Sequence, residues 1–296
     1  MKHGKILVTG SSGLIGTAVC AVLASQGHDV RRFDIADQKG GFGDILAPAD
    51  LDIAMKGCMG VIHLAAVSRV IWGEQDPDKC RETNAVGTRN IIDRLRLSDL
   101  QPWLIFGSSR EVYGQSCAFP VTESEPLHPI NHYARSKVEA EQAVKQAMVA
   151  GLRASILRFS TVYGAIADHA DRVIPAFCRA AVRGLPLRVD GAANSIDITH
   201  VADVAECISN VAKHLSGGKS LAPMHLTTGQ GTSLLELAHA VRRLAQSKSE
   251  IITSAPRDFD VSTFIGDPKF AEAQIGWRSK VPLETGLKEL VSQFRE

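Results

Sequence analysis

A tyrosine and a lysine one helical turn apart, Tyr133 and Lys137, form the most suggestive chemical pair in the chain. They lie in residues 133–149, a segment rich in Ala, Glu, Gln and Lys that predicts a long amphipathic helix. Positions i and i+4 share one helix face, so the ammonium would lie beside the phenol and lower the pKa of its hydroxyl. Such a phenol could take the proton of a substrate hydroxyl while a hydride leaves the same carbon for a nicotinamide ring. The alternative is an exposed aromatic residue beside a solvated lysine.

Two serines end the strand expected before this helix. Ser108 and Ser109 follow the apolar run Trp103–Gly107, which is typical of a buried strand. Ser109 could hydrogen-bond the same substrate oxygen as Tyr133. The candidate catalytic residues are therefore Ser109, Tyr133 and Lys137.

The nicotinamide would belong to a dinucleotide held by the first strand, turn and helix of the chain. Residues 5–9 predict a buried strand, glycines follow at positions 10, 13 and 16, and a helical pattern begins at residue 14. Glycine lets the backbone approach a pyrophosphate closely, and the start of the helix offers N–H groups and a positive dipole end. The residues expected to bind the cofactor here are Gly10, Ser12, Gly13, Leu14, Ile15 and Gly16.

An acidic residue follows the glycines at a distance typical of nucleotide-binding sites. Asp34 closes the second predicted strand, Asp29–Asp34. A carboxylate at this place can accept hydrogen bonds from both hydroxyls of an adenosine ribose and repels a 2′-phosphate. The sequence therefore favours NAD over NADP. A plain strand–turn–helix with a solvated aspartate is the alternative.

Bulk properties exclude several classes of protein. The 296 residues carry a formal net charge of +1 with dispersed basic residues, so neither nucleic acid nor a membrane surface is an expected partner. No apolar stretch is long enough to span a bilayer, and no signal peptide is expected. The six cysteines form no CxxC pair and no cluster with histidine, which predicts reduced thiols, a cytoplasmic protein and no metal site. They are Cys20, Cys58, Cys80, Cys117, Cys178 and Cys207.

The order of predicted elements indicates an α/β protein. Strands alternate with helices at a spacing that implies right-handed crossovers and a parallel sheet covered on both faces. After about Thr161 this rhythm gives way to short strands and helices without a second glycine turn. We therefore expect a dinucleotide-binding domain at residues 1–163, to which a segment near 190–215 could return. Residues 164–296 would form a smaller mixed α/β lobe, with the substrate between the two.

Taken together, these motifs resemble the NAD-dependent epimerase/dehydratase family of extended short-chain dehydrogenases/reductases. The resemblance covers nearly the whole chain and implies a Rossmann-type, doubly wound parallel sheet with bound NAD. The matching segments are Gly10/Gly13/Gly16, Asp34, Gly43–Ile45, His63–Ala66, Asn84–Thr88, Ser108–Ser109, Val112–Gly114, Tyr133 with Lys137, Leu157–Phe159, Val162–Gly164, His200–Val201 and Asp203–Val204.

The resemblance also implies further site residues and partners. Substrates typical of the family are nucleotide-diphosphate sugars, and many relatives dimerise through helices that correspond to residues 76–97 and 133–149, which implies a homodimer. The cofactor residues implied in this way are Asp44 and Ile45 beside the adenine, Leu64, Ala65 and Ala66 along the crevice, Asn84, and Tyr133 with Lys137 near the nicotinamide ribose.

One departure from the family pattern bears on the reaction. Sugar-nucleotide dehydratases usually carry Asp-Glu before Val-Tyr-Gly, and the aspartate protonates the departing hydroxyl, whereas this chain has Arg110 and Glu111. An arginine, with a pKa above about 12, cannot readily supply that proton, which disfavours dehydration. Glu111 could act as a base next to a ketone, bind a sugar hydroxyl, or pair with Arg110.

A second departure concerns the substrate phosphates. Thr161 stands where the family usually has Asn, and a phosphate-binding arginine is missing from Ile196–Ile198. Its loss removes a contact worth on the order of 1.5–3 kcal/mol. Arg257 matches another family arginine near the diphosphate, and Arg172 could compensate. The candidate substrate residues are Ser108, Arg110, Glu111, Thr161, Arg172 and Arg257.

These observations favour an NAD-dependent nucleotide-sugar epimerase that works through a transient keto intermediate. An NAD-dependent dehydrogenase or ketoreductase acting on a sugar or small alcohol is the first alternative, because a phosphate arginine is missing. A non-catalytic NAD(H)-binding regulator on the same fold is the second, since a fold does not by itself determine function.

Overall fold

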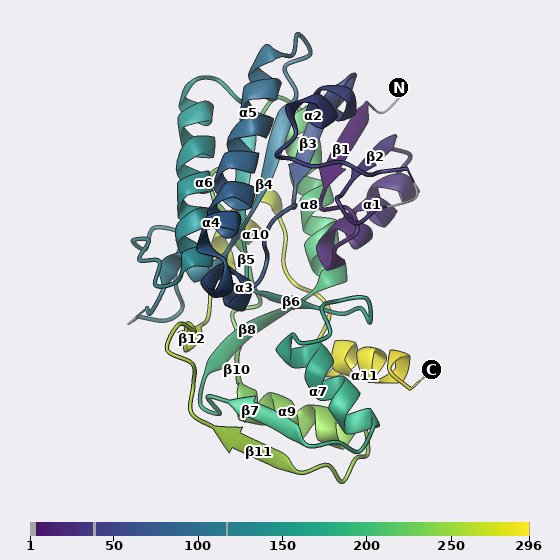
Figure 1. Ribbon diagram of the computed structural model, residues 1–296, viewed down its shortest axis with the longest axis vertical. Coiled ribbons are helices and arrows are strands. Elements are labelled where there is room, and N and C mark those ends of the chain that lie inside the picture. Colours follow the sequence, from purple (N-terminus) through teal and green to yellow (C-terminus); the bar gives the residue numbers. More distant parts are fainter. Residues whose placement is uncertain (1–3, 38–39, 117, 296) are drawn as a thin grey trace. The chain divides into compact units, whose positions relative to one another are not determined.

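The structure, a computed structural model, describes residues 4–37, 40–116 and 118–295 and divides into two compact units (Figure 1). The first unit comprises Met1–Gly114, Pro126–Phe159 and Ala205–Met224. The second comprises Gln115–Glu125, Ser160–Val204 and His225–Glu296. Each unit therefore combines segments that are far apart in the sequence.

Six strands form a sheet in the order β2-β1-β3-β4-β5-β9, and all of them lie in the first unit except β9, of which only Met224 does. The pairs from β2 to β5 are all parallel, and β1, β3, β4 and β5 are buried along almost their whole length, as in sheets covered on both faces. The strands are Lys5–Thr9 (β1), Val30–Phe33 (β2), Cys58–His63 (β3), Trp103–Ser109 (β4), Ala154–Phe159 (β5) and Met224–Leu226 (β9). The expected Rossmann-type parallel sheet is confirmed.

The strand order of this sheet identifies the place for a ligand. The chain passes from β1 to β2 on one side and then returns to β3 on the other side of β1, so the order reverses at β1. In open α/β sheets, ligands bind outside the carboxyl ends of the strands at such a reversal. The glycine turn follows β1 directly, and Leu64–Ala66 follows β3. Both predicted cofactor segments therefore lie at the expected edge.

Helices of the first unit pack on this sheet, with α5 and α6 side by side on one face (Figure 1). The sequence predicts one helix over residues 76–97, but a π-helical turn, Glu82–Val86 (η1), separates α4 from α5. A 3-10 turn, Arg110–Tyr113 (η2), follows β4. The helices are Leu14–Ser25 (α1), Pro48–Met55 (α2), Val70–Gln75 (α3), Pro77–Arg81 (α4), Gly87–Leu97 (α5), His132–Val149 (α6) and, from Ala205 onward, Val201–Ser216 (α8).

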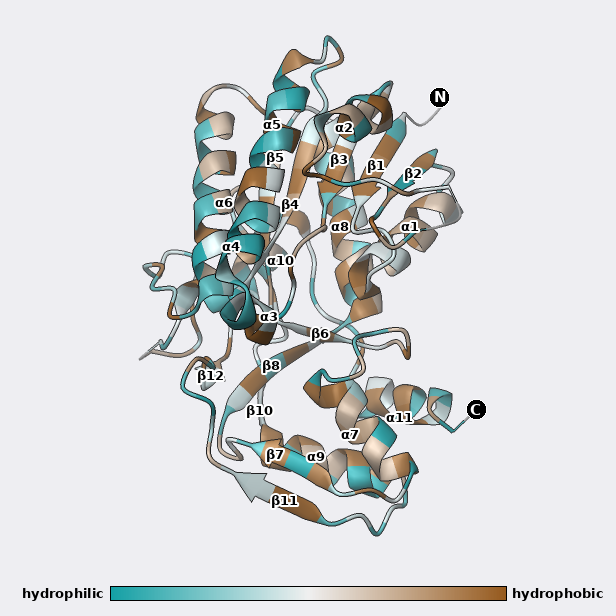
Figure 2. Ribbon diagram, in the orientation of Figure 1, coloured by the Kyte–Doolittle hydropathy of each residue, from teal (hydrophilic) through white to brown (hydrophobic). Residues whose placement is uncertain are grey.

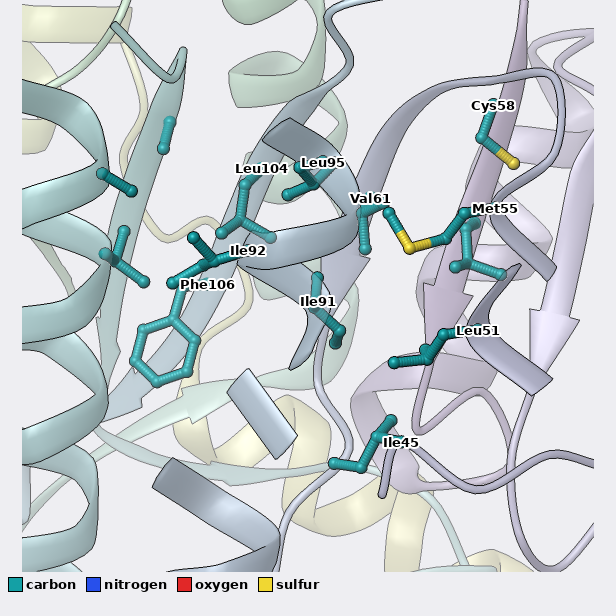
Figure 3. Close-up of a cluster of buried hydrophobic side chains, with 14 of the residues drawn as sticks. Ile45, Leu51, Met55, Cys58, Val61, Ile91, Ile92, Leu95, Leu104 and Phe106 are labelled. Carbon is teal, nitrogen blue, oxygen red and sulfur yellow. The ribbon is translucent and has the colours of Figure 1, made fainter. Parts of the chain in front are cut away.

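A cluster of buried apolar side chains joins one face of the sheet to α2, α5 and α6 (Figure 3). Leu104 and Phe106 of β4 lie beside Ile92 of α5 in this cluster, and Ala140 and Val144 belong to α6 (Figure 3). Figure 2 shows the complementary pattern: the central strands are mostly hydrophobic, and α5 carries many hydrophilic residues. Truncating a buried side chain of this kind to alanine costs about 2–5 kcal/mol. This packing fixes α6, the helix with the predicted catalytic pair, against the sheet.

The second unit is a mixed α/β structure. Strand β8 pairs with β10, β12 and β6, while β7 pairs with β11, and an apolar core lies among α7, α9 and α11. Its elements are Thr161–Tyr163 (β6), Val173–Val182 (α7), Leu187–Asp190 (β7), Ser195–His200 (β8), Gly231–Ser233 (β10), Leu234–Leu244 (α9), Ile251–Ser254 (β11), Thr263–Phe264 (β12), Lys269–Ile275 (α10) and Leu283–Gln293 (α11).

Membrane and cysteine features complete the description. Within residues 4–37, 40–116 and 118–295, no helix has both the length and the apolarity needed to cross a membrane. The described cysteines are buried free thiols, namely Cys20, Cys58, Cys80, Cys178 and Cys207. Cys117 lies outside the described residues.

Candidate active site

The glycine turn after β1 combines tight packing with an open helix start. A Cβ on Gly10, whose φ is +68°, would lie 2.6 Å from the backbone nitrogen of Ala65, and a Cβ on Gly16 would lie 2.1 Å from the carbonyl oxygen of Gly10. A Cβ on Gly13 would approach the same oxygen only to 3.4 Å. Packing therefore demands glycine at positions 10 and 16. At position 13 a glycine instead leaves room for a ligand close to the backbone, as a pyrophosphate requires.

The N-terminus of α1 suits the diphosphate of an adenine dinucleotide, and the nearby Asp34 suits the hydroxyls of its adenosine ribose. Gly13 caps α1 without a side-chain hydrogen bond, and the first turn contains no acidic residue, so its N–H groups and dipole suit an anion. Asp34 accepts hydrogen bonds from Ser12 N at 2.9 Å and Ala36 N at 2.8 Å, one on each carboxylate oxygen. Each oxygen keeps a further lone pair that a ribose hydroxyl could use. These residues fit NAD.

Other predicted cofactor residues occupy different surroundings. Leu64 and Ala65 are half-buried after β3, with hydrogen bonds from their nitrogens to the carbonyl and hydroxyl oxygens of Thr9 at 3.1 and 3.3 Å. Ala66 is also half-buried. Asp44 accepts a hydrogen bond from Leu46 N at 2.9 Å. Ile45 is a buried member of the apolar cluster and fills the space that a Cβ on Gly87 would need.

Tyr133 and Lys137 project from the first turns of α6 and are 8% and 4% exposed. The Lys137 Nζ lies 6.0 Å from the centre of the Tyr133 ring and donates a hydrogen bond to Gly107 O at 2.9 Å. Burial lowers the pKa of Lys137 to about 8, so the amine is still mostly protonated at neutral pH. A largely desolvated ammonium beside a phenol favours the phenolate.

Two side chains fix the start of α6. The Asn131 side chain caps the helix by accepting a hydrogen bond from Ala134 N at 2.8 Å, and Glu74 accepts one from His132 N at 2.8 Å. Acceptors at a helix N-terminus satisfy N–H groups that have no partner within the helix. The position of Tyr133 is therefore set by residues that the sequence analysis did not single out.

The serines at the end of β4 have different environments. Ser109 Oγ accepts a hydrogen bond from Glu111 N at 3.2 Å, so its own hydrogen can still be given to a substrate oxygen. Ser108, which is 2% exposed, donates a hydrogen bond to Glu141 Oε1 at 2.7 Å. Its hydroxyl is thus engaged inside the first unit, whereas Ser109 suits a catalytic role.

The Arg110–Glu111 pair forms an ion pair, which was one of the three roles open to Glu111. The Arg110 Nη2 lies 2.9 Å from Glu111 Oε1, and Asn131 Nδ2 donates to the other carboxylate oxygen at 3.1 Å. Glu111 is only 7% exposed. Both of its oxygens are therefore held, and the carboxylate connects η2 to the cap of α6.

A buried ion pair behind the site was not anticipated from the sequence. Arg158 donates to both oxygens of Glu141, at 2.9 and 2.7 Å, and also to the hydroxyl of Tyr113. Burial alone would raise the pKa of Glu141, but the hydrogen bonds and charge of Arg158 outweigh it and keep this pKa below its usual value. Glu141 follows Tyr133 and Lys137 at the same spacing of four, a signal that could have placed it on the buried helix face.

The remaining predicted substrate residues belong to the second unit. Thr161 is half-buried in β6 and pairs with Ile198. The Arg172 Nε lies 3.6 Å from Asp168 Oδ1. Arg257 donates to both oxygens of Asp260, at 2.8 and 3.0 Å. Each arginine thus has an acidic neighbour within the unit.

No group of three or more His, Cys, Asp or Glu side chains in the described parts of the chain could hold a metal ion. The side chains that the structure offers for chemistry at the edge of the sheet are Ser109, Tyr133 and Lys137, beside a turn that fits a dinucleotide.

Comparison with known proteins gives consistent matches over most of the chain. The model of the NAD dependent epimerase/dehydratase family matches residues 6–223. A UDP-glucose 4-epimerase of Rhizobium meliloti is 29% identical over 315 residues, covering 96% of this chain and 94% of that protein. The crystal structure of a UDP-glucose 4-epimerase of Thermotoga maritima with UDP-glucose has a TM-score of 0.91 and 27% identity over 98% of each chain. That of a UDP-glucose 4-epimerase of Brucella ovis in complex with NAD has a TM-score of 0.89 and 29% identity, also over 98% of each.

Proposed function

The chain belongs to the NAD-dependent epimerase/dehydratase family, and from this we propose that it is an NAD-dependent nucleotide-sugar epimerase acting through a transient keto intermediate. The observation that carries the proposal is the buried Tyr133–Lys137 pair, whose ammonium lies 6.0 Å from the phenol ring centre. Similar proteins named as UDP-glucose 4-epimerases make UDP-glucose and its 4-epimer the first substrates to test.

NAD supplies a hydride acceptor and donor when it is bound, and the residues of this chain handle the proton. Tyr133, as phenolate, takes the proton of the sugar hydroxyl, while Ser109 donates a hydrogen bond to the same oxygen. Lys137 keeps the phenolate stable from its place against Gly107 O. Loss of one proton and one hydride converts the alcohol to a ketone. Return of the hydride to the opposite face of the carbonyl carbon, and of the proton to its oxygen, would invert the carbon with no net redox change.

Arg110 and Glu111 support epimerisation rather than dehydration. A dehydratase needs an acid to protonate the departing hydroxyl, but Arg110 occupies that position, and the guanidinium cannot readily release a proton. Glu111 has one oxygen against Arg110 and the other against Asn131. Neither residue is arranged as the missing acid.

A net sugar dehydrogenase or ketoreductase is the second candidate function. Arg172 and Arg257, which the sequence analysis expected to bind the substrate phosphates, each have an aspartate neighbour in the second unit. Because these arginines are already paired, a substrate without a diphosphate is favoured, and such substrates are typical of this alternative. A third possibility is an NAD(H)-binding regulator, against which the buried Tyr133–Lys137 pair argues.

The test is turnover of UDP-sugars with bound NAD, followed by NMR of the sugar and by absorbance of reduced nicotinamide. We expect inversion at one sugar carbon without accumulation of NADH. Replacing Tyr133 by Phe should lower kcat by about 10²–10⁴-fold, while Tyr163→Phe, a buried tyrosine of the second unit, serves as the matched control. Stoichiometric NADH would instead identify a dehydrogenase, and NAD binding without any turnover would identify a regulator. Full activity of Tyr133→Phe would eliminate the mechanism.

We further propose a cytoplasmic homodimer that pairs through α5 and α6. An ion-pair cluster lies on these helices and α4, with Glu139 Oε1 at 2.7 Å from Arg81 Nη2 and 2.6 Å from Arg89 Nη2. The buried free thiols fit a reducing compartment. A monomeric mass by light scattering would refute the dimer.

A further inference from the structure

We infer that His63, the last residue of β3, is a positioning residue that connects the cofactor-lining ends of β1 and β3 to the helix carrying Tyr133. The inference rests on the proposed function for its catalytic readout. It concerns five buried side chains, all within the first unit, that are joined by hydrogen bonds and end on the backbone carbonyl of Tyr133.

The imidazole of His63 bridges two threonines. His63 is 1% exposed, and its Nδ1 lies 2.8 Å from Thr9 Oγ1 while its Nε2 lies 3.0 Å from Thr88 Oγ1. Thr9 precedes the glycine turn, and Thr88 lies in the first turn of α5. The ring of His63 therefore connects β1, which precedes the glycine turn, to α5 on one face of the sheet.

The direction of every hydrogen bond around this ring can be derived. Thr88 gives its single hydroxyl hydrogen to Asn84 O at 2.6 Å, so its oxygen must accept from His63, and the proton of the ring is on Nε2. Nδ1 is then an acceptor and receives the hydroxyl hydrogen of Thr9. Thr9 Oγ1 in turn accepts from Ala65 N at 3.3 Å. Of these bonds, the one in which Nδ1 accepts from Thr9 requires a neutral ring.

The protein keeps the ring neutral. Burial, with a further contribution from the charge of Lys137, lowers the pKa of His63 to about 3. The ring also contacts two hydroxyls, of Thr9 and Thr88, and the Phe106 ring, whose centre is 5.8 Å away. The donor and acceptor roles of the ring nitrogens therefore stay the same at neutral pH.

The second half of the chain of bonds leads to the catalytic helix through the π-helical turn η1. Asn84, at 1% exposure, donates to Ser136 Oγ at 2.8 Å and to Val67 O at 3.1 Å, and accepts from Val67 N at 2.8 Å. Ser136 passes its own hydrogen to Tyr133 O at 2.7 Å. π-helical turns are rare and frequent at functional sites. Here the turn presents the Asn84 amide to α6.

The consequence is a fixed spacing between two parts of the reaction site. On one side of His63, Thr9 and Ala65 shape the edge that holds the cofactor. On the other side, Thr88, through Asn84 and Ser136, holds the backbone of Tyr133. A misplacement of about 1 Å at a reacting group can cost about 10²-fold in rate, so a bridge that defines this spacing acts on catalysis without touching substrate.

Two substitutions separate the halves of the bridge, because Asn and Gln amides reach different ring positions. His63→Asn can retain an acceptor near Nδ1 for Thr9 but loses the donor to Thr88. His63→Gln can retain a donor near Nε2 for Thr88 but loses the acceptor for Thr9. The holoenzyme variants are compared for NAD affinity, for kcat and KM with a UDP-sugar, and for the pKa of the Tyr133 phenol. That pKa is read from tyrosinate absorbance after subtracting the signal of Tyr133→Phe.

We expect the two variants to change different quantities. His63→Asn should lower kcat by about 10- to 100-fold and shift the Tyr133 pKa, with the smaller effect on NAD affinity. His63→Gln should weaken NAD affinity by about five- to tenfold, with the smaller effect on kcat and on the Tyr133 pKa. Thr88→Val should change the same quantities as His63→Asn, and Thr9→Val the same quantities as His63→Gln. These two threonine variants provide the test if a His63 variant folds poorly.

Equal losses of NAD affinity and kcat in all four variants, or no loss in any, would overturn the positioning role. NAD affinity and the Tyr133 pKa are measurable without turnover. Failure of the proposed epimerase activity with a preserved split in these two quantities would therefore leave the inference about His63 standing.

Discussion

Replacing Lys137 by Met should stabilise the folded protein at neutral pH while it abolishes catalysis. Burial lowers the pKa of Lys137 from its ordinary 10.5 to about 8, a difference that corresponds to about 3 kcal/mol. This is the cost of holding an ammonium inside the protein, and methionine, an apolar side chain of similar length, does not incur it. Gly107 O loses a hydrogen bond, which offsets about 1 kcal/mol. The expected net gain is about 2 kcal/mol, or about 4 °C in Tm for a chain of this size.

The pH dependence of this gain follows from linkage. The folded pKa lies below the unfolded one, so between about pH 8 and 10.5 the unfolded chain binds more protons and the wild type gains stability as pH rises. The Met variant lacks this gain, and its advantage should shrink from about pH 7 to about pH 10. Urea unfolding of both proteins, freed of nucleotide, measures the difference at each pH, and contributions from other groups cancel. A less stable Met variant at neutral pH, or an advantage that does not change with pH, would refute the reasoning.

Three further predictions concern the same unit. Gly16→Ala should unfold at lower temperature, because its Cβ would lie 2.1 Å from Gly10 O, whereas Gly13→Ala should fold normally and bind NAD more weakly in titration calorimetry. Glu141→Gln should cost about 3–5 kcal/mol in denaturant unfolding because it leaves Arg158 buried without its charge partner, and a Glu141→Leu/Arg158→Met double variant should lose less. Since the pKa of Glu141 is depressed in the folded state, its contribution to stability is present above the ordinary value of 4.5 and is lost as pH falls through the folded pKa. Wild type should then lose stability faster than the double variant on acidification, and parallel curves would contradict this.

The features that the sequence predicted well are those formed by near neighbours. The first strand, the glycine turn and α1 follow one another within residues 5–25, and the pattern of glycines has a direct steric meaning at Gly10 and Gly16. The Tyr133–Lys137 spacing likewise follows from helical periodicity alone. The parallel sheet and the family followed from the alternation of elements and from these motifs.

The features that the sequence could not supply join residues far apart in the chain. His63 meets Thr9 across 54 positions, and Asn84 meets Ser136 across 52. Spacing within one helix or strand says nothing about which other strand or helix becomes its neighbour, and a polar residue reads as exposed until burial forces it to find a partner.

Local sequence patterns thus determined two features. Helical periodicity placed the phenol and the ammonium on one face of α6, and the glycine pattern predicted the open backbone after β1. Only the tertiary structure decided what holds them there: the Arg158 guanidinium against Glu141, the Asn131 amide between Glu111 and α6, and the neutral ring of His63. The physical reason is that buried polar groups must be satisfied by partners that strand order and helix packing bring together, and neither is written in the spacing of neighbouring residues.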